Sequence, residues 1–169
     1  IMEEDYGKVV MQCLLEPSAL PPEKILRREH LITLGMLRDS IRAMIEGDIQ
    51  LAKGVIARDN EVDRLYFLLV RILRTIIQNP SLSEKLEIYP IDCLDYRLTA
   101  SLIESVGDLS SQIADYVIRL NGTKWNNEVS GSISSLHKVI QEAYNDAIAA
   151  FLSRNIIIAE SVREKRDDI

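Results

Sequence analysis

Two pairs of acidic residues stand out because the members of each pair are four positions apart. Asp59 and Asp63 form the first pair, and Glu104 and Asp108 form the second. Residues four apart lie on one face of an α-helix, so the two carboxylates of a pair can approach the same cation. Carboxylate oxygens suit Mg²⁺, Ca²⁺ and Mn²⁺, and they also bridge iron clusters. The four residues are therefore candidate metal ligands. A solvated acidic helix face is the alternative interpretation of the same spacing.

Other residue types with catalytic chemistry show no comparable pattern. His30 and His137 belong to no Glu-x-x-His motif, which ferritin-like di-iron bundles require. We interpret both histidines as surface or boundary residues. The sequence contains no recognisable nucleophile motif, no glycine-rich phosphate loop and no paired thiolates, since Cys13 and Cys93 are far apart. None of these residue types therefore indicates a catalytic site, and a carboxylate-bridged metalloprotein is an alternative that the acid pairs allow.

The elements that hold the acid pairs are predicted to be helices. Of 169 residues, 47% are hydrophobic, 5% are aromatic and only 7 are glycine, a composition that favours helix over sheet. Proline and glycine positions and the helical spacing of apolar residues place the boundaries. We predict an extended segment over Tyr6–Leu15 and a loop from residue 79 to about 90. The predicted helices cover about residues 21–46, 48–78, 92–120, 127–152 and 155–169.

Apolar stripes predict how these helices pack. In the helix over 48–78, four apolar residues are each seven apart: Val55, Val62, Leu69 and Ile76. The helix over 21–46 has apolar residues at Leu31, Leu34, Leu37, Ile41, Met44 and Ile45. The helix over 92–120 has a stripe with spacings of four and three, typical of a helical bundle, at Leu102, Val106, Leu109, Ile113, Val117 and Leu120. Glu104 and Asp108 lie opposite that last stripe, so we expect them to face away from the core.

A shift of 107 residues aligns part of the chain with itself. Asp39 aligns with Asp146, Val55 aligns with Val162, and the turn at residues 46–48 aligns with that at 153–155. This alignment predicts a three-helix repeat over 21–121 and a partial second repeat over 122–169, preceded by a linker or extended arm at 1–20. Shared helical periodicity is the alternative explanation for the similarity.

Charge and hydropathy restrict the class of protein. The chain has 20 basic and 26 acidic residues and a net charge of −6, which disfavours DNA binding over its surface. No apolar run approaches the roughly 18–20 residues that span a bilayer, and no signal peptide opens the chain. With lone cysteines as well, these features predict a cytoplasmic protein.

Two segments resemble the PhoU family of phosphate-uptake regulators: GDIQLAKGVIARDNEVDRLYFLLVRIL and LDYRLTASLIESVGDLSSQIAD. That family has two three-helix repeats with E/D-x-x-x-D motifs, and the matching positions here are Asp59 with Asp63 and Glu104 with Asp108. The stretch LLEPSALPPEKILRREHLI looks like the archaeal branch, in which an AbrB-like DNA-binding domain precedes the PhoU part. The resemblance covers about residues 14–169.

The resemblance implies an antiparallel all-α bundle with an incomplete second repeat. It implies a regulatory adaptor, not an enzyme. Such an adaptor restrains phosphate uptake by acting on the phosphate transporter and its sensor kinase. The resemblance also implies a homodimer. Members bind iron or zinc clusters through the acidic motifs, so iron or zinc is expected at the four carboxylates. Contact with DNA is expected only through an upstream domain. A PhoU-like module for another transport or transcription system is the alternative.

Two positions depart from the family pattern. Arg166 aligns with Asp59 in the second repeat, so a second metal cluster is not expected there. Leu109 follows the Glu104–Asp108 motif, where relatives often have histidine or another polar residue. That change weakens the expected metal site.

Overall fold

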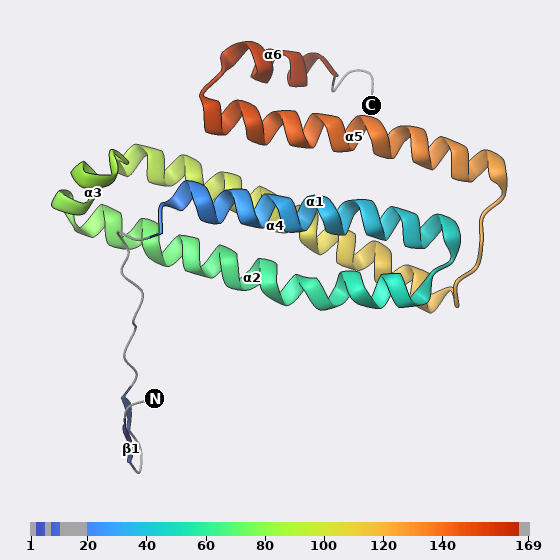
Figure 1. Ribbon diagram of the computed structural model, residues 1–169, viewed down its shortest axis with the longest axis horizontal. Coiled ribbons are helices and arrows are strands. Elements are labelled where there is room, and N and C mark those ends of the chain that lie inside the picture. Colours follow the sequence, from blue (N-terminus) through green and yellow to red (C-terminus); the bar gives the residue numbers. More distant parts are fainter. Residues whose placement is uncertain (1–2, 6–7, 11–19, 166–169) are drawn as a thin grey trace.

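The computed structural model describes residues 3–5, 8–10 and 20–165, and helices dominate this part of the chain (Figure 1). A two-stranded antiparallel ladder, β1 (Glu3–Asp5) and β2 (Lys8–Val10), precedes them. The predicted extended segment and the predicted linker over 1–20 fall largely outside the described residues. The described helices are α1 (Pro22–Glu46), α2 (Ile49–Gln78), α3 (Pro80–Leu86), α4 (Pro90–Arg119), α5 (Asn127–Ser153) and α6 (Ile156–Lys165).

Helices α1, α2 and α4 pack against one another as a three-helix bundle, with α4 behind α1 and α2 in the view of Figure 1. Helix α5 lies along α1, and α6 folds back on α5. The core is apolar: one cluster of buried side chains centres on Leu26, Leu69 and Ile103, and another centres on Met36, Val55 and Val62. The predicted all-α bundle is confirmed. No helix among the described residues is long and apolar enough to cross a membrane.

Local sequence signals explain where the helices begin and end. Gly47 ends α1 with a φ of 68°, a left-handed conformation that glycine adopts readily. The side chain of Asp48 accepts a hydrogen bond of 2.9 Å from the backbone N–H of Leu51 and so caps α2. The predicted loop after Gln78 is wrong over residues 80–86, because Asn79 caps the short helix α3 and Pro80 occupies its first turn.

Of the three predicted apolar stripes, only that of α2 is buried as predicted, and Leu31 of the α1 stripe is exposed. Val55, Val62, Leu69 and Ile76 of α2 are all buried. On α4 the prediction is wrong, since Leu102, Leu109 and Leu120 are more than half exposed. The buried face of α4 instead consists of Cys93, Ala100, Ile103, Gly107, Ser110, Ala114 and Val117.

Most of these residues are small, and this explains the difference, because α4 approaches its neighbours closely around Gly107. A Cβ atom at Gly107 would lie 3.3 Å from Thr33 Cγ2 and 3.4 Å from Val62 Cγ1. A leucine in that position would overlap α1 and α2. Small residues therefore face the core on α4, and the large leucines face solvent.

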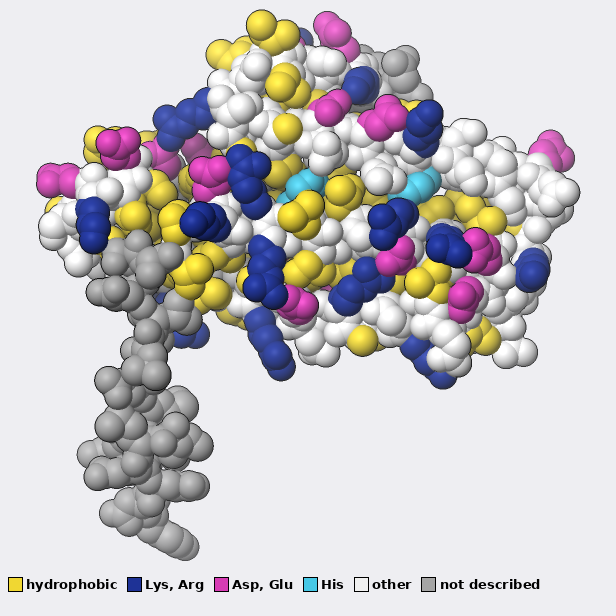
Figure 2. All heavy atoms as spheres, viewed as in Figure 1, with side chains coloured by type: hydrophobic (Ala, Val, Ile, Leu, Met, Phe, Trp, Pro, Cys, Tyr) yellow, Lys and Arg dark blue, Asp and Glu magenta, His cyan; other side chains and the backbone are white. Residues whose placement is uncertain are grey.

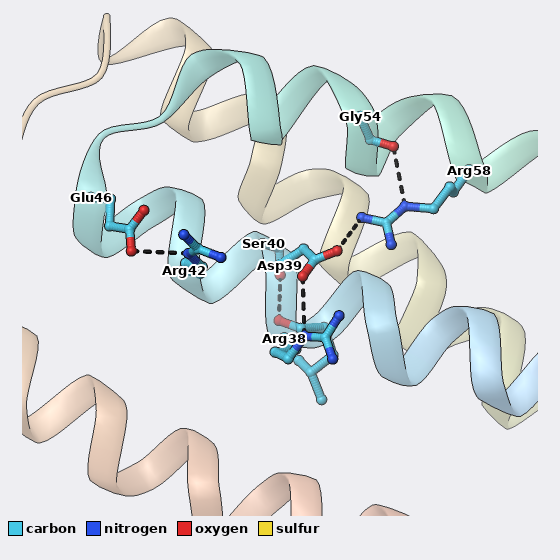
Figure 3. A network of polar contacts seen from close by, with 8 residues as sticks. Arg38, Asp39, Ser40, Arg42, Glu46, Gly54 and Arg58 are labelled. Atoms are coloured by element: carbon cyan, nitrogen blue, oxygen red, sulfur yellow. Dashed lines mark hydrogen bonds and ion pairs between the residues drawn. The ribbon is translucent and has the colours of Figure 1, made fainter.

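The offset of 107 residues recurs in the structure. Asp39 on α1 pairs with Arg58 on α2 at 2.7 Å (Figure 3), and Asp146 on α5 pairs with Lys165 on α6 at 2.8 Å. Each pair has the same separation along the chain, and both residues of the second pair are 107 positions after those of the first. The turns agree as well, because Gly47 and Arg154 are both left-handed caps. The hairpins α1–α2 and α5–α6 are thus built in the same way.

Figure 3 shows the contacts of Arg58, an arginine on α2. Arg58 donates to Asp39 Oδ2 and to the carbonyl oxygen of Gly54, and Arg38 donates to Asp39 Oδ1 at 3.1 Å. Burial raises the pKa of Asp39, but the hydrogen bonds from Arg58 and Arg38 outweigh burial and lower it. The contact fixes α1 to α2 beside their connecting turn.

Candidate functional site

The structure brings the four predicted ligands to the contact between α2 and α4. Asp59 and Asp63 are half-buried on α2, Glu104 is half-buried on α4, and Asp108 is exposed one turn further along α4. We call these four residues the acid cluster. Asp59 and Asp108 line a groove of about 570 Å³, together with Ser111, Gln112 and Asp115.

The carboxylates of the acid cluster interact electrostatically across the two helices. Burial raises the pKa of Asp59, and the negative charges of Asp108 and Asp63 raise it further, while a hydrogen bond with Ser111 lowers it. Burial also raises the pKa of Glu104, and Asp108, Asp63 and Asp59 add to that rise. The cluster is therefore a concentration of negative charge, which a cation would neutralise.

The expectation that Glu104 and Asp108 face away from the core is wrong for Glu104, which is half-buried, and correct for Asp108, which is exposed. It followed from the leucine stripe, which faces solvent instead of the bundle. With the small-residue face of α4 turned inward, Glu104 and Asp108 lie at the edge of the core, where α4 meets α2. A residue between them, Gly107, is close to Asp59, because a Cβ there would be 3.8 Å from Asp59 Oδ1.

The carboxylate oxygens of the acid cluster are suitable metal ligands. The side chains are not arranged, however, as a complete set of ligands around one ion. Four carboxylates suit a hard cation, and they also suit iron or zinc. However, the described residues include no group of three or more His, Cys, Asp or Glu side chains arranged to hold one ion. Metal binding at Asp59, Asp63, Glu104 and Asp108 thus stays a prediction.

A fifth acidic residue, Glu29, was missed by the sequence reasoning. Glu29 on α1 is fully buried, and neither of its carboxylate oxygens has a hydrogen-bond partner among the described residues. Burial raises its pKa to about 8, and the charge of Glu104 contributes to the rise. Glu29 is therefore largely protonated at neutral pH, in contrast to an ordinary glutamate.

The interpretation of His30 as a surface or boundary residue is also wrong. His30 is buried between α1 and α5, where its Nε2 lies 3.2 Å from Asn145 Oδ1 and its ring meets the Tyr144 ring edge to face. Burial lowers the pKa of His30, the hydrogen bond with Asn145 opposes this, and Arg27 lowers it further. His137 is half-buried, as predicted.

A second polar contact joins α1 and α5 close to His30. The hydroxyl groups of Thr33 and Tyr144 are 2.7 Å apart, and burial raises the pKa of Tyr144 above its usual range. Figure 2 shows histidine side chains along this line, between basic and acidic side chains of the two helices. The contact between α1 and α5 is thus more polar than the core of the three-helix bundle.

The helical spacing of Glu29 from its neighbours on α1 is the one sequence feature that relates to its burial. Glu29 occupies the stripe of α1 that includes Ile25, Thr33, Met36 and Ser40, all of which are buried. This stripe contains polar residues, whereas the stripe predicted for α1 consists of large apolar residues that begin at Leu31. Leu31 is in fact exposed.

Comparison with protein families adds independent information to this geometry. A three-helix bundle with facing acid pairs on two helices defines an all-α domain with a potential cation site. Residues 26–117, which include all of α2 and α3 and nearly all of α1 and α4, match the PhoU domain. The match covers more than half of the chain, and the chain belongs to the PhoU domain family. No curated protein and no solved structure matches it.

Proposed function

We propose that this protein regulates phosphate homeostasis, and that it acts by contact with other proteins rather than by catalysis. The observation that carries the proposal is the PhoU match over α1, α2 and α4. Both acidic motifs lie inside the matched residues, and the fold brings them to one helix contact. A regulatory adaptor needs surfaces more than reacting groups, and the bundle has long exposed helix faces.

The partner that we propose is a phosphate transporter or its sensor protein. The protein works in the cytoplasm as a homodimer, and it reaches DNA only through a separate upstream domain. A PhoU-like module for another transport or transcription system is the second candidate, because the PhoU match identifies the domain and not its partner.

Phosphate uptake by cells tests the regulatory role. Cells that lack the gene should take up labelled phosphate faster than the parent strain when phosphate is plentiful, because the restraint on the transporter is gone. Restoring the gene should restore the parental rate. Unchanged phosphate uptake, together with a change in uptake of another solute, would favour the second candidate.

Metal content tests the acid cluster. Protein purified without chelator should contain stoichiometric iron, zinc or another divalent cation, and the double variant Glu104→Ala, Asp108→Ala should lose it. The loss is expected because the variant removes half of the carboxylates that attract the cation. Plasma mass spectrometry measures the metal, and circular dichroism checks that the helices persist.

A matched control is available on α6. Glu160 and Glu164 have the same spacing of four and lie outside the acid cluster. Their double replacement by alanine should leave the metal content unchanged. Equal metal content in wild type and in the Glu104→Ala, Asp108→Ala variant would contradict metal binding at the cluster, although the proposed regulatory role would stand.

A further inference from the structure

A groove lies between α1 and α5, and it shares no residue with the acid cluster. Its volume is about 280 Å³, close to the roughly 300 Å³ at which small-molecule sites begin. We call it the α1–α5 groove. Its lining includes Arg38, Ile41, Arg42 and Ile45 of α1, and Ser134 and His137 of α5. The groove thus combines two guanidinium groups and an imidazole with two apolar side chains.

Both arginines of the groove keep hydrogen-bond donors available. Arg42 donates from Nε to Glu46 Oε1 at 2.9 Å, and Arg38 donates from Nε to Asp39 Oδ1 at 3.1 Å (Figure 3). These contacts use one nitrogen of each guanidinium. Among the described residues, the terminal nitrogens Nη1 and Nη2 of both arginines therefore have no hydrogen-bond partner. Adjacent turns of α1 present four nitrogens in the planar fork geometry that binds oxyanions.

His137 adds a donor from the opposite wall of the groove. Burial lowers the pKa of His137, a hydrogen bond with Gln141 raises it, and the charge of Arg38 lowers it, so Arg38 and His137 are close across the groove. The imidazole is thus largely neutral at pH 7 and offers one ring N–H. Its Nδ1 is buried and has no partner among the described residues. A ligand in the groove can supply the hydrogen bond that the ring lacks.

The charge around the groove is positive, although the chain as a whole has a net charge of −6. Three arginines, Arg38, Arg42 and Arg58, share two carboxylates, those of Asp39 and Glu46. One positive charge is left without a counter-ion in this network. A local positive excess on an acidic protein attracts an anion.

The repeat of 107 residues shows that these arginines are not needed to build the hairpin. The pair of Asp39 with Arg58 recurs in the second hairpin as Asp146 with Lys165. The positions equivalent to Arg38, Arg42 and Glu46 are instead uncharged, since they are Asn145, Ala149 and Ser153. The α5–α6 hairpin forms without these charges. Arg38 and Arg42 are therefore free to serve a purpose other than holding α1 to α2.

We propose that the α1–α5 groove binds a phosphoryl group, with Arg38 and Arg42 donating to its oxygens from α1 and His137 donating from α5. The number of donors favours this ligand over a carboxylate. A carboxylate has two oxygens, whereas a phosphoryl group has three and carries up to two negative charges. Inorganic phosphate and a phosphorylated metabolite share this chemistry, and Ile41 and Ile45 offer apolar surface to the organic part of the latter.

Nuclear magnetic resonance titration of ¹⁵N-labelled protein with inorganic phosphate tests the site, with ionic strength held constant by sodium chloride. Backbone signals around Arg38 and His137 should shift and saturate, with a dissociation constant of roughly millimolar order. The double variant Arg38→Gln, Arg42→Gln should bind at least about tenfold more weakly, because each arginine loses charge-assisted hydrogen bonds. Arg42→Gln and His137→Ala should each weaken binding as well, and neither side chain contacts Asp39.

Arg71 and Arg74 on α2 provide the matched control. Both are exposed and lie outside the groove, so Arg71→Gln, Arg74→Gln removes the same two charges from another surface. This control variant should bind phosphate like the wild type. Absence of saturable shifts in the wild type, with every probe, would overturn the proposal. Equal weakening in the two double variants would overturn it too, because binding would then depend on net charge alone.

A second titration, with adenosine monophosphate, separates the two sources of the phosphoryl group. Tighter binding than that of phosphate, with shifts that extend to Ile41 and Ile45, would support a phosphorylated metabolite. Equal or weaker binding would support inorganic phosphate. In both cases the Arg38→Gln, Arg42→Gln variant should lose affinity. This inference goes beyond the proposed function, because phosphate uptake by cells is measured separately and a protein that binds no phosphoryl group can still restrain a transporter.

Discussion

At pH 8, the Glu29→Gln variant should have a free energy of unfolding roughly 3–4 kcal/mol above that of the wild type. At pH 5 the difference should fall to about 1 kcal/mol or less. Glu29 is fully buried without a partner for either oxygen, and its pKa is raised from 4.5 to about 8 by burial and by Glu104. Urea unfolding followed by circular dichroism at both pH values measures the difference.

The sign of the effect follows from proton binding. Between pH 4.5 and pH 8, the folded state keeps the proton on Glu29, whereas the unfolded state releases it. Wild-type stability is therefore highest below the unfolded pKa and falls as the pH rises through the folded pKa. Glutamine has a similar shape and cannot ionise, so the variant loses this part of the pH dependence.

Two further variants isolate the cause. Glu142→Gln removes an exposed carboxylate on α5 and should leave the stability difference between pH 5 and pH 8 unchanged. Glu104→Gln should flatten the pH dependence in part, since the charge of Glu104 contributes to the raised pKa of Glu29. If wild type and Glu29→Gln lose stability equally between pH 5 and pH 8, folding does not raise the pKa of Glu29 and the prediction is wrong.

The helices could be predicted from the sequence wherever a local signal determined them. Gly47 and Asp48 specify the turn between α1 and α2 through backbone conformation and capping, and both act within a few residues. The stripe of α2 was also clear, because Val55, Val62 and Leu69 are large, apolar and regularly spaced. Such patterns depend on one helix at a time.

The faces of α1 and α4 could not be predicted in this way, because close packing reverses the usual preference for large residues inside. Gly107 and Ala114 face the core since α1 and α2 leave little space there, and Leu109 faces outward on the same helix. The distance between α4 and its neighbours is a property of the tertiary structure, and the spacing of apolar residues does not reveal it. The same limitation hid Glu29, whose burial depends on α4 and α5 closing over α1.

The candidate site was therefore predicted in its members and not in its surroundings. Asp59, Asp63, Glu104 and Asp108 were named from spacing and from the family motif, and the fold does bring the two pairs to the same helix contact. The coupling of Glu104 to the buried Glu29 depends on the orientation of α4, which spacing does not reveal. Spacing in the sequence identifies residues on one helix face, but the packing of the bundle determines which faces of two helices meet.

Gly47→Ala should destabilise the protein by about 3–5 kcal/mol, and this is the largest loss that we expect from a single methyl group. Gly47 has a φ of 68°, where an L side chain is strained. A Cβ there would also lie 2.2 Å from the carbonyl oxygen of Gly122, which is a backbone atom in the connection between α4 and α5. That atom cannot move unless the connection itself moves.

Gly122→Ala should have a similar effect, because its Cβ would lie 2.5 Å from the carbonyl oxygen of Gly47 and its φ is 67°. Gly54→Ala provides the control, since Gly54 lies inside α2 with no atom near the added Cβ. That variant should gain about 0.5–1 kcal/mol from the better helix propensity of alanine. Thermal unfolding compares the three variants. Equal midpoints for Gly47→Ala and Gly54→Ala would contradict both the contact with Gly122 and the strain of the positive φ, because these two features distinguish Gly47 from Gly54.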